Sequence, residues 1–232
     1  MVKSIAFDTG PIISLATNNL LWILEPLRKD FEGDFLMPDS VRKELIDNPM
    51  KGKRFKFEAM QVLSFVNRGI LKTVEMPQVK SEAAKLLETA NNVFSAKGKW
   101  IQLVHPAEIE AVALALFMKS SAFVVDERTT RMLIEYPEKL KEIMEHRLHT
   151  KISVDRHNLD EFRKRTSSIR MIRSTELVTI AFEKGLLDQY LPNIPEPKRE
   201  LMDSLLWGLK LNGCSISEKE INKIVKIETK NK

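Results

Sequence analysis

The sequence predicts an α/β protein in which helices cover both faces of a central, mainly parallel sheet. Short apolar segments that suit buried strands alternate along the chain with longer segments that suit helices. The breaks between them carry Pro, Gly, Asp or Ser, the residues that commonly end a strand or begin a helix. This alternation is typical of a three-layer α/β/α arrangement.

The first fifty residues contain two strand-to-helix units. A short, partly β-branched strand is expected at residues 2–7, and it ends at Asp8, directly before a helix. A second apolar segment, residues 35–37, leads into a helix that carries Glu44 and is expected to stop before Pro49. Each unit therefore delivers an acidic residue to the region where a strand ends and a helix begins.

The middle of the chain continues the alternation. A helix is expected over residues 53–67, and the side chains spaced along one of its faces are Phe57, Met60, Leu63 and Val66. A strand at residues 70–74 and a helix at residues 81–94 follow. The most apolar helix, residues 108–118, leads into a buried strand that ends at Asp126.

Three parts are predicted: a core at residues 1–135, a charged helical insertion at residues 136–168, and a last strand with C-terminal helices at residues 169–232. The elements of the third part are a strand at 169–172 and helices at 175–184 and 197–211. Ser217 and Glu220 form a capping-box pattern before a final short helix. These C-terminal helices are expected to complete or flank the core.

Composition excludes several classes of protein. The 232 residues are 43% hydrophobic and 30% charged, which excludes a disordered or collagen-like chain. No apolar run approaches the roughly 20 residues that a membrane span needs, and no signal peptide is recognised. The single cysteine, Cys214, cannot form an internal disulfide, so a reducing, cytoplasmic location is expected. The net charge of +5 is only mildly basic.

Four carboxylates are placed where strands end or helices begin. Asp8 and Asp126 each directly follow a predicted strand, and parallel strands end at one edge of a sheet. Glu44 lies one turn into the helix after the second strand, and Glu108 lies in the first turn of the helix before Asp126. Acids that gather without a basic residue among them repel one another, and a hard divalent cation is the usual remedy. The four side chains therefore form a candidate metal site.

Each acid taken alone also has a simpler interpretation. Asp8 could only cap the helix after it, and Asp126 could only cap a helix that begins at Glu127. Glu44 could be an ordinary exposed helix residue. The joint placement of the acids is what favours a site.

Four segments resemble the motifs of the PIN-domain nucleases, the family that includes the VapC-like toxins. They are IAFDT at residues 5–9, MPDSVRKEL at 37–45, EIEAVALA at 108–115 and FVVD at 123–126. One such segment is a weak signal, but four in this order are fairly specific. Residues 174–224 are also similar to the helical tail of some archaeal-type members. The resemblance implies the PIN fold for the core.

The resemblance implies a role for each acid. The catalytic residues and metal ligands would be Asp8, Glu44, Glu108 and Asp126, with Thr9 and Ser14 supporting them through hydrogen bonds. Glu110 is the alternative to Glu108, since the two point to different faces of one helix. We favour Glu108, because the small apolar residues after it fall where the family's motif has them. Glu127 would be a further acid at the site, or only a favourable residue at a helix N-terminus.

The implied cofactor is Mg²⁺ or Mn²⁺, which carboxylate oxygens suit better than they suit zinc. One or two ions would activate water for attack on a phosphodiester and stabilise the leaving 3′-oxygen. A run of basic residues would grip the single-stranded substrate, namely Arg163, Lys164, Arg165, Arg170 and Arg173. A second, weaker patch comprises Lys97, Lys99 and Trp100. A solvated helix face explains the same charges equally well.

The leading hypothesis is a metal-dependent endoribonuclease that hydrolyses single-stranded RNA. The alternative is a PIN-like RNA-binding or assembly protein without turnover, and an acid-site phosphatase ranks third. RNA is the expected partner, and no membrane is involved. An antitoxin-like or RNA-processing protein and a homodimer are further candidate partners, because Leu201, Leu205, Leu206 and Trp207 lie on one apolar stripe. Packing of that stripe onto the core explains it as well.

Overall fold

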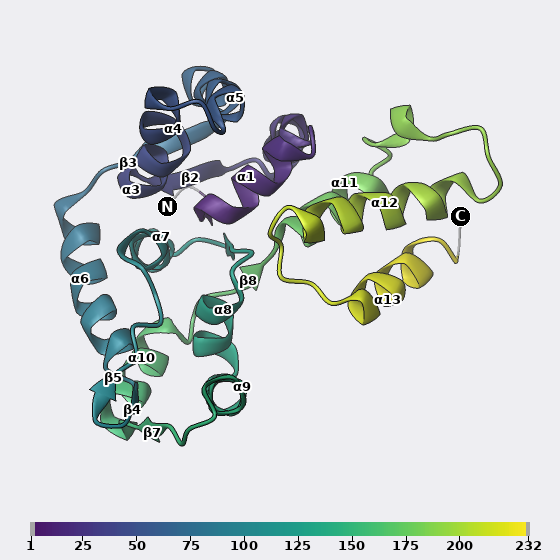
Figure 1. Ribbon diagram of the computed structural model, residues 1–232. Coiled ribbons are helices and arrows are strands. Elements are labelled where there is room, and N and C mark those ends of the chain that lie inside the picture. The colour runs from purple at the N-terminus through teal and green to yellow at the C-terminus, as the bar shows by residue number, and fades with distance from the viewer. Residues whose placement is uncertain (1–2, 231–232) are drawn as a thin grey trace.

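A five-stranded sheet forms the centre of the computed structural model, which describes residues 3–230 (Figure 1). Its strands are β1 (Ser4–Phe7), β2 (Asp34–Pro38), β3 (Leu71–Val74), β6 (Ala122–Val124) and β8 (Met171–Ile172). They run in the order β3-β2-β1-β6-β8, and every neighbouring pair is parallel. The predicted α/β class is confirmed. Val2, expected in the first strand, lies outside the described residues.

Strand β1 occupies the middle of this sheet. Its four residues are all buried, and Ala6 pairs in register with Leu36 on β2 and Phe123 on β6. The rings of Phe7 and Phe35 lie 5.1 Å apart. Because β1 is covered on both faces and paired on both edges, its carboxyl end is a rigid support for the residues that follow it.

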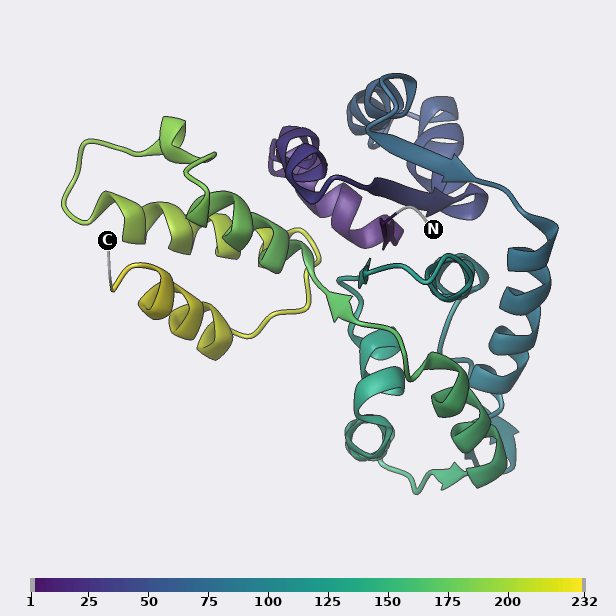
Figure 2. The same ribbon diagram turned by 180° about the vertical axis from the view of Figure 1, so that it is seen from behind.

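Helices complete the layers on both sides of the sheet. The first half of the chain contributes α1 (Thr9–Thr17), η1 (Leu21–Ile23), α2 (Leu24–Phe31), α3 (Asp39–Arg42), η2 (Lys43–Asp47), α4 (Asn48–Lys51), α5 (Lys56–Asn67), α6 (Pro77–Asn91) and α7 (Pro106–Phe117). Helix α7 packs against β1 and β2, and α6 packs against α7, whereas α1 packs against α5. Figures 1 and 2 show α7 and α1 on opposite sides of the sheet. The three-layer arrangement is thereby confirmed.

The helix that carries Glu44 does not stop before Pro49, as expected, but continues to Lys51. Its middle, η2, is a π-helical turn, in which the hydrogen bonds span one residue more than in an α-helix. Pro49 is the second residue of α4, which directly follows this π-helical turn. Turns of this kind are frequent at functional sites, and this one contains Glu44.

Helix α5 buries the expected face only in part, because Leu63 and Val66 pack against the core whereas the first two residues of that face do not. Phe57 and Met60 are 69% and 53% exposed, while Ala59 and Val62 are fully buried. Helical periodicity identifies residues that share a face, but only the position of the neighbouring helices decides which face is covered. Gly69, at φ +70°, follows the helix and allows the chain to turn into β3.

A small antiparallel sheet, which the sequence did not indicate, joins the insertion to the core. Its strands are β4 (Phe94–Ala96), β5 (Lys99–Trp100) and β7 (Ser153–Val154). The residues of the proposed insertion include α9 (Pro137–Leu148) and α10 (Arg156–Thr166), which follow α8 (Arg128–Glu135). The side chain of Asn158 donates to the main-chain oxygen of Asn92 at 3.1 Å, which fixes α10 beside the end of α6.

The C-terminal helices project beside the core (Figure 1). They are α11 (Ser174–Glu183), η3 (Asp188–Tyr190), α12 (Pro197–Leu211) and α13 (Glu218–Glu228). The predicted bounds of α12 and the capping box of α13 are both confirmed. Among residues 3–230, no helix combines the length and the apolar character that a membrane span requires.

Candidate functional site

The carboxyl ends of β1 and β6 bring Asp8 and Asp126 to one edge of the sheet. The backbone N–H of Asp8 donates to the main-chain oxygen of Val124 at 3.0 Å, which ties the two strand ends together. A Cβ atom placed on Gly10 would lie 3.5 Å from Cβ of Asp126 and 3.7 Å from Oδ2 of Asp8. Both acids therefore lie beside Gly10.

Asp8 is a buried carboxylate that lacks a full set of partners. It is only 4% exposed, and its Oδ1 has no hydrogen-bond partner among the described residues. Burial raises the pKa of Asp8 to about 7, the nearby charges of Glu108 and Glu44 add to the rise, and the N–H groups of Thr9 and Gly10 oppose it. An unpaired oxygen in such surroundings is costly unless a proton or a cation satisfies it.

Glu44 comes to the same region from the other side of the sheet edge. Its Oε2 accepts a hydrogen bond of 2.6 Å from the hydroxyl of Thr9, the residue directly after Asp8. The Glu44 side chain is exposed, in contrast to that of Asp8. This hydrogen bond is the contact through which Thr9 would support the site, as expected.

Glu108 lies in the first turn of α7 and is held by two donors. The backbone N–H of His105 and the hydroxyl of Thr130 each donate to its Oε2 at 3.2 Å. Burial raises the pKa of Glu108, and the charge of Glu127 adds to that rise although the two donors oppose it. The carboxylate is therefore half-buried, restrained and close to another acid.

Glu108 and its alternative, Glu110, act on different neighbours. Glu108 is close enough to Asp8 for its charge to raise the pKa of that residue. Glu110 instead acts on Lys80 of α6, whose pKa is raised chiefly by a hydrogen bond to Glu75. The two glutamates thus lie on different faces of α7, and the face of Glu108 is the one toward Asp8.

Asp126 is engaged more tightly than the sequence indicated. Its Oδ1 accepts from the backbone N–H of Ser174 at 2.8 Å, and its Oδ2 accepts from the Ser174 hydroxyl at 2.7 Å. Asp126 thereby joins β6 to the start of α11. Its neighbour Glu127 accepts from the backbone N–H of Thr130 at 2.6 Å and so caps α8. The charge of Glu127 also raises the pKa of Glu108.

Ser14 does not contact the acids, which corrects the expectation of a direct supporting bond. It lies more than one helical turn beyond Asp8, and its hydroxyl donates at 3.4 Å to the main-chain oxygen of Asn212. The side chain is buried. Its hydrogen bond therefore attaches α1 to the end of α12 rather than to the site.

As they stand, no three Asp, Glu, His or Cys side chains of residues 3–230 are gathered closely enough to hold a metal ion. The donor set nevertheless fits a hard cation, because an unpartnered buried carboxylate oxygen is accompanied by two further carboxylates. A family model described as a PIN domain matches residues 4–136, more than half of the chain. The chain belongs to the PIN-domain family.

Searches of curated proteins and of solved structures found no significant match. PIN domains have a nuclease fold and generally act as metal-dependent nucleases, so membership agrees with the acids at the sheet edge. The matched residues include Asp8, Glu44, Glu108 and Asp126, and they end at the start of the insertion. The C-terminal helices lie outside the matched PIN domain.

The basic residues predicted to bind nucleic acid do not form one free patch on this PIN protein. Arg165 pairs with Glu82 at 2.9 Å and with Glu161 at 3.0 Å. Arg173 is buried and pairs with acids of two helices. The remaining members, Arg163, Lys164 and Arg170, are exposed. Neighbours in a helical sequence point in different directions, which is why a run of charges in the sequence is scattered in space.

Sequence reasoning missed the part that Ser174 plays at the site. The signal was available, because Ser174 lies just beyond the strand at residues 171–172, as Asp8 and Asp126 lie beyond theirs. The same rule about strand ends in a parallel sheet would have placed it beside Asp126.

Proposed function

We propose that this PIN-domain protein is a metal-dependent endoribonuclease that hydrolyses phosphodiester bonds of single-stranded RNA. The observation that carries the proposal is Asp8, a buried carboxylate with one unpartnered oxygen and with Glu44 and Glu108 close enough to raise its pKa. A divalent cation would bind the unpartnered oxygen of Asp8 and would offset the repulsion among the three carboxylates. Structural carboxylates, by contrast, are paired with donors or basic groups.

Asp8, Glu44 and Glu108 would hold the cation. All three supply oxygen, which favours Mg²⁺ or Mn²⁺. When bound, the ion would supply positive charge that lowers the pKa of water and balances the charge that develops on the phosphate. Of these acids Asp8 is the most rigidly placed, and the exposed Glu44 has the most freedom to move toward it.

The other polar residues hold these acids in place. Thr9 orients Glu44, and Thr130 together with the N–H of His105 orients Glu108. Asp126 is proposed as an acid of the site whose oxygens are fixed by Ser174, each with a lone pair left over. Glu127 is proposed as a further acid, since its charge acts on Glu108.

The proposal predicts that the protein cleaves labelled single-stranded RNA with Mn²⁺ or Mg²⁺ and not with EDTA. Glu108→Gln and Glu110→Gln form a matched pair on one helix. Glu108→Gln should lower the cleavage rate by about 100-fold or more, because it removes a charge that holds the cation. Glu110→Gln should cleave within a few-fold of the wild type, since the charge of Glu110 acts on Lys80 of α6.

Equal rates for the two variants would contradict the assignment of Glu108. RNA binding without cleavage by the wild type, with several RNAs and either ion, would instead favour a PIN-like RNA-binding protein without turnover. A toxin and an RNA-processing enzyme would both pass this test, and the sequence of the RNA that is cleaved would separate them.

A further inference from the structure

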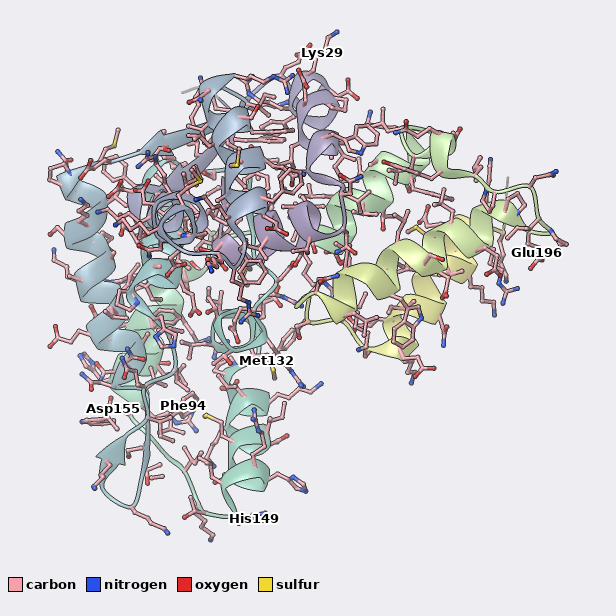
Figure 3. The ribbon with its side chains drawn as sticks, turned by 45° about the horizontal axis from the view of Figure 1, so that its top comes forward. Lys29, Phe94, Met132, His149, Asp155 and Glu196 are labelled. Carbon is pink, nitrogen blue, oxygen red and sulfur yellow. The ribbon has the colours of Figure 1, made fainter. Side chains whose placement is uncertain are left out.

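A cleft of about 770 Å³ lies between the core and the C-terminal helices. Helices α8 and α9 form one wall, and the end of α12 with the connection to α13 forms the other. Figure 1 shows this connection on the side of the C-terminal helices that faces α8. Met132 of α8 lines the cleft, and Figure 3 shows it on the flank of the core toward those helices. We call this feature the cationic cleft.

The lining of the cationic cleft is strongly basic. Its charged residues are Arg128, Arg131, Lys139, Arg173, Lys210 and Glu220. The single acid, Glu220, forms an ion pair with Arg173 at 3.1 Å and accepts a hydrogen bond from the Ser217 hydroxyl. It therefore does not neutralise the other cations of the lining. Arg128 and Lys139 are exposed and have no ion-pair partner within residues 3–230. The cleft therefore offers unneutralised positive charge to a ligand.

The cationic cleft borders the chain segment that carries Asp126 and Glu127. Arg128 follows Asp126 and Glu127 directly in the chain. On the opposite wall, the backbone N–H of Ser215 donates at 3.1 Å to the main-chain oxygen of Asp126. One wall of the cleft is thus bonded to the main chain at Asp126, and the other begins two residues after it.

An aromatic side chain stands at the cleft between α8 and α9. Tyr136 is 60% exposed and lines the cleft, although a ring of this size is usually buried when it has only a packing role. An exposed ring beside unpaired cations is the combination that binds single strands, because the cations contact the backbone and a base stacks on the ring.

We propose that the cationic cleft binds the backbone of single-stranded RNA on one side of the scissile bond, with Arg128 and Lys139 contacting phosphates and Tyr136 stacking on a base. This inference rests on the proposed function for the choice of RNA as ligand. It adds a part of the substrate path that the C-terminal helices, outside the matched PIN domain, help to build.

The test measures binding of a fluorescein-labelled single-stranded RNA of mixed sequence to the full chain by anisotropy, in EDTA so that cleavage does not interfere. The cleft variant is Arg128→Glu with Lys139→Glu. The control is Arg147→Glu with Lys29→Glu, which changes the net charge equally at exposed positions away from the cleft. The neutral double variant with Gln at residues 128 and 139 and thermal melts of all variants guard against misfolding.

The cleft variant should bind the RNA at least 10-fold more weakly, and the control should bind within about 3-fold of the wild type. The neutral variant should lower the slope of log K against log salt by roughly 1.4, since each lost phosphate contact removes about 0.7. Tyr136→Ala should weaken binding by about 5-fold or more with an unchanged slope, because stacking is independent of salt-released counterions.

Equal losses of RNA affinity in the cleft variant and the control would overturn the proposal, because they would show that RNA is attracted by the overall positive charge of the protein. Unchanged RNA binding by the cleft variant would overturn it even if the wild type cleaves RNA, and the proposed function would then stand alone. Loss of binding in the cleft variant together with a wild type that never cleaves would uphold the cleft and contradict the nuclease. A wild type that binds a poly-glutamate peptide through these cations and no RNA would replace RNA by an acidic protein.

Discussion

Asp8→Asn is expected to stabilise the metal-free protein by about 4 kcal/mol at pH 8, although it removes the central acid of the site. The pKa of Asp8 is raised from the ordinary 3.8 to about 7, because the carboxylate is buried and close to Glu108 and Glu44. At pH 8 the folded protein therefore carries a charge that the unfolded chain solvates better. Asparagine has the same shape and no charge, so this cost disappears.

The sign of the pH dependence follows from the raised pKa. Between pH 4 and pH 7 the folded state holds a proton on Asp8 that the unfolded state has released, so the wild type loses stability as the pH rises through this window. Above pH 7 the loss levels off. The advantage of Asp8→Asn should accordingly shrink from about 4 kcal/mol at pH 8 to less than about 2 kcal/mol at pH 5.

Thermal melts with EDTA and with Mn²⁺ measure both effects. In EDTA at pH 8 the variant should melt roughly 8 °C or more above the wild type, at about 2–4 °C per kcal/mol for a chain of this size. Mn²⁺ should raise the melting temperature of the wild type and leave that of Asp8→Asn nearly unchanged, because only a charged Asp8 binds the ion. Asp160→Asn, at an exposed position on α10, is the control and should behave as the wild type in both conditions.

A variant that melts below the wild type in EDTA would show that the Asp8 carboxylate is satisfied by a contact that stabilises the fold. Equal shifts with Mn²⁺ in both proteins would place the ion away from Asp8. The first outcome would remove the main support for a cation site, and the second would redirect the search to other acids.

The sheet and the acids at its edge were predictable because both depend on local sequence. One short apolar strand ends at Asp8 and another ends at Asp126. Because parallel strands have their carboxyl ends at the same edge of a sheet, these two strands predict that both acids lie at that edge. The choice of Glu108 over Glu110 rested on the small apolar residues that follow. The choice of Glu108 stays a prediction, and the paired variants Glu108→Gln and Glu110→Gln test it.

Features that depend on distant partners could not be predicted in this way. Strands β4 and β7 are three and two residues long, and Phe94 finds its partner Val154 only because the insertion folds back. The bonds between Asp126 and Ser174 likewise cross 48 positions of sequence. In the sequence, Arg128 and Arg173 are both simply basic residues. In the part of the chain that the structure describes, Arg173 is paired with two glutamates and Arg128 is not, and this difference in neighbouring acids distinguishes a structural cation from one that can bind a ligand.

Arg173→Met is expected to lower the free energy of unfolding by about 2 kcal/mol, because it removes charged hydrogen bonds to two partly exposed glutamates and one donor from the main-chain oxygen of Ser215. Arg173 donates to Glu176 at 2.8 Å, to Glu220 at 3.1 Å and to the main-chain oxygen of Ser215 at 3.3 Å. Its own burial disfavours the charge, yet the bonds and charges of the two glutamates hold its pKa above the ordinary value. One side chain thus joins β8, α11, the Ser215 segment and α13.

Arg199→Met is the matched control, because Arg199 also pairs with a glutamate, at 3.2 Å, but both side chains are mostly exposed. It should change stability by no more than about 0.5 kcal/mol. Urea denaturation at pH 7 compares the two, and equal losses would show that burial of Arg173 adds nothing.

The difference between Arg173→Met and the wild type should narrow at low pH. Burial alone would raise the pKa of Glu220, but bonds from Ser217 and Arg173 lower it to about 2. A lowered carboxyl pKa gives stability that is present above pH 4.5 and is lost as the pH falls toward 2.

The Ser215 segment that Arg173 holds is also a wall of the cationic cleft. Arg173→Met should therefore become sensitive to proteolysis at residues 212–217. It should also bind RNA more weakly than the wild type under conditions in which both proteins are fully folded.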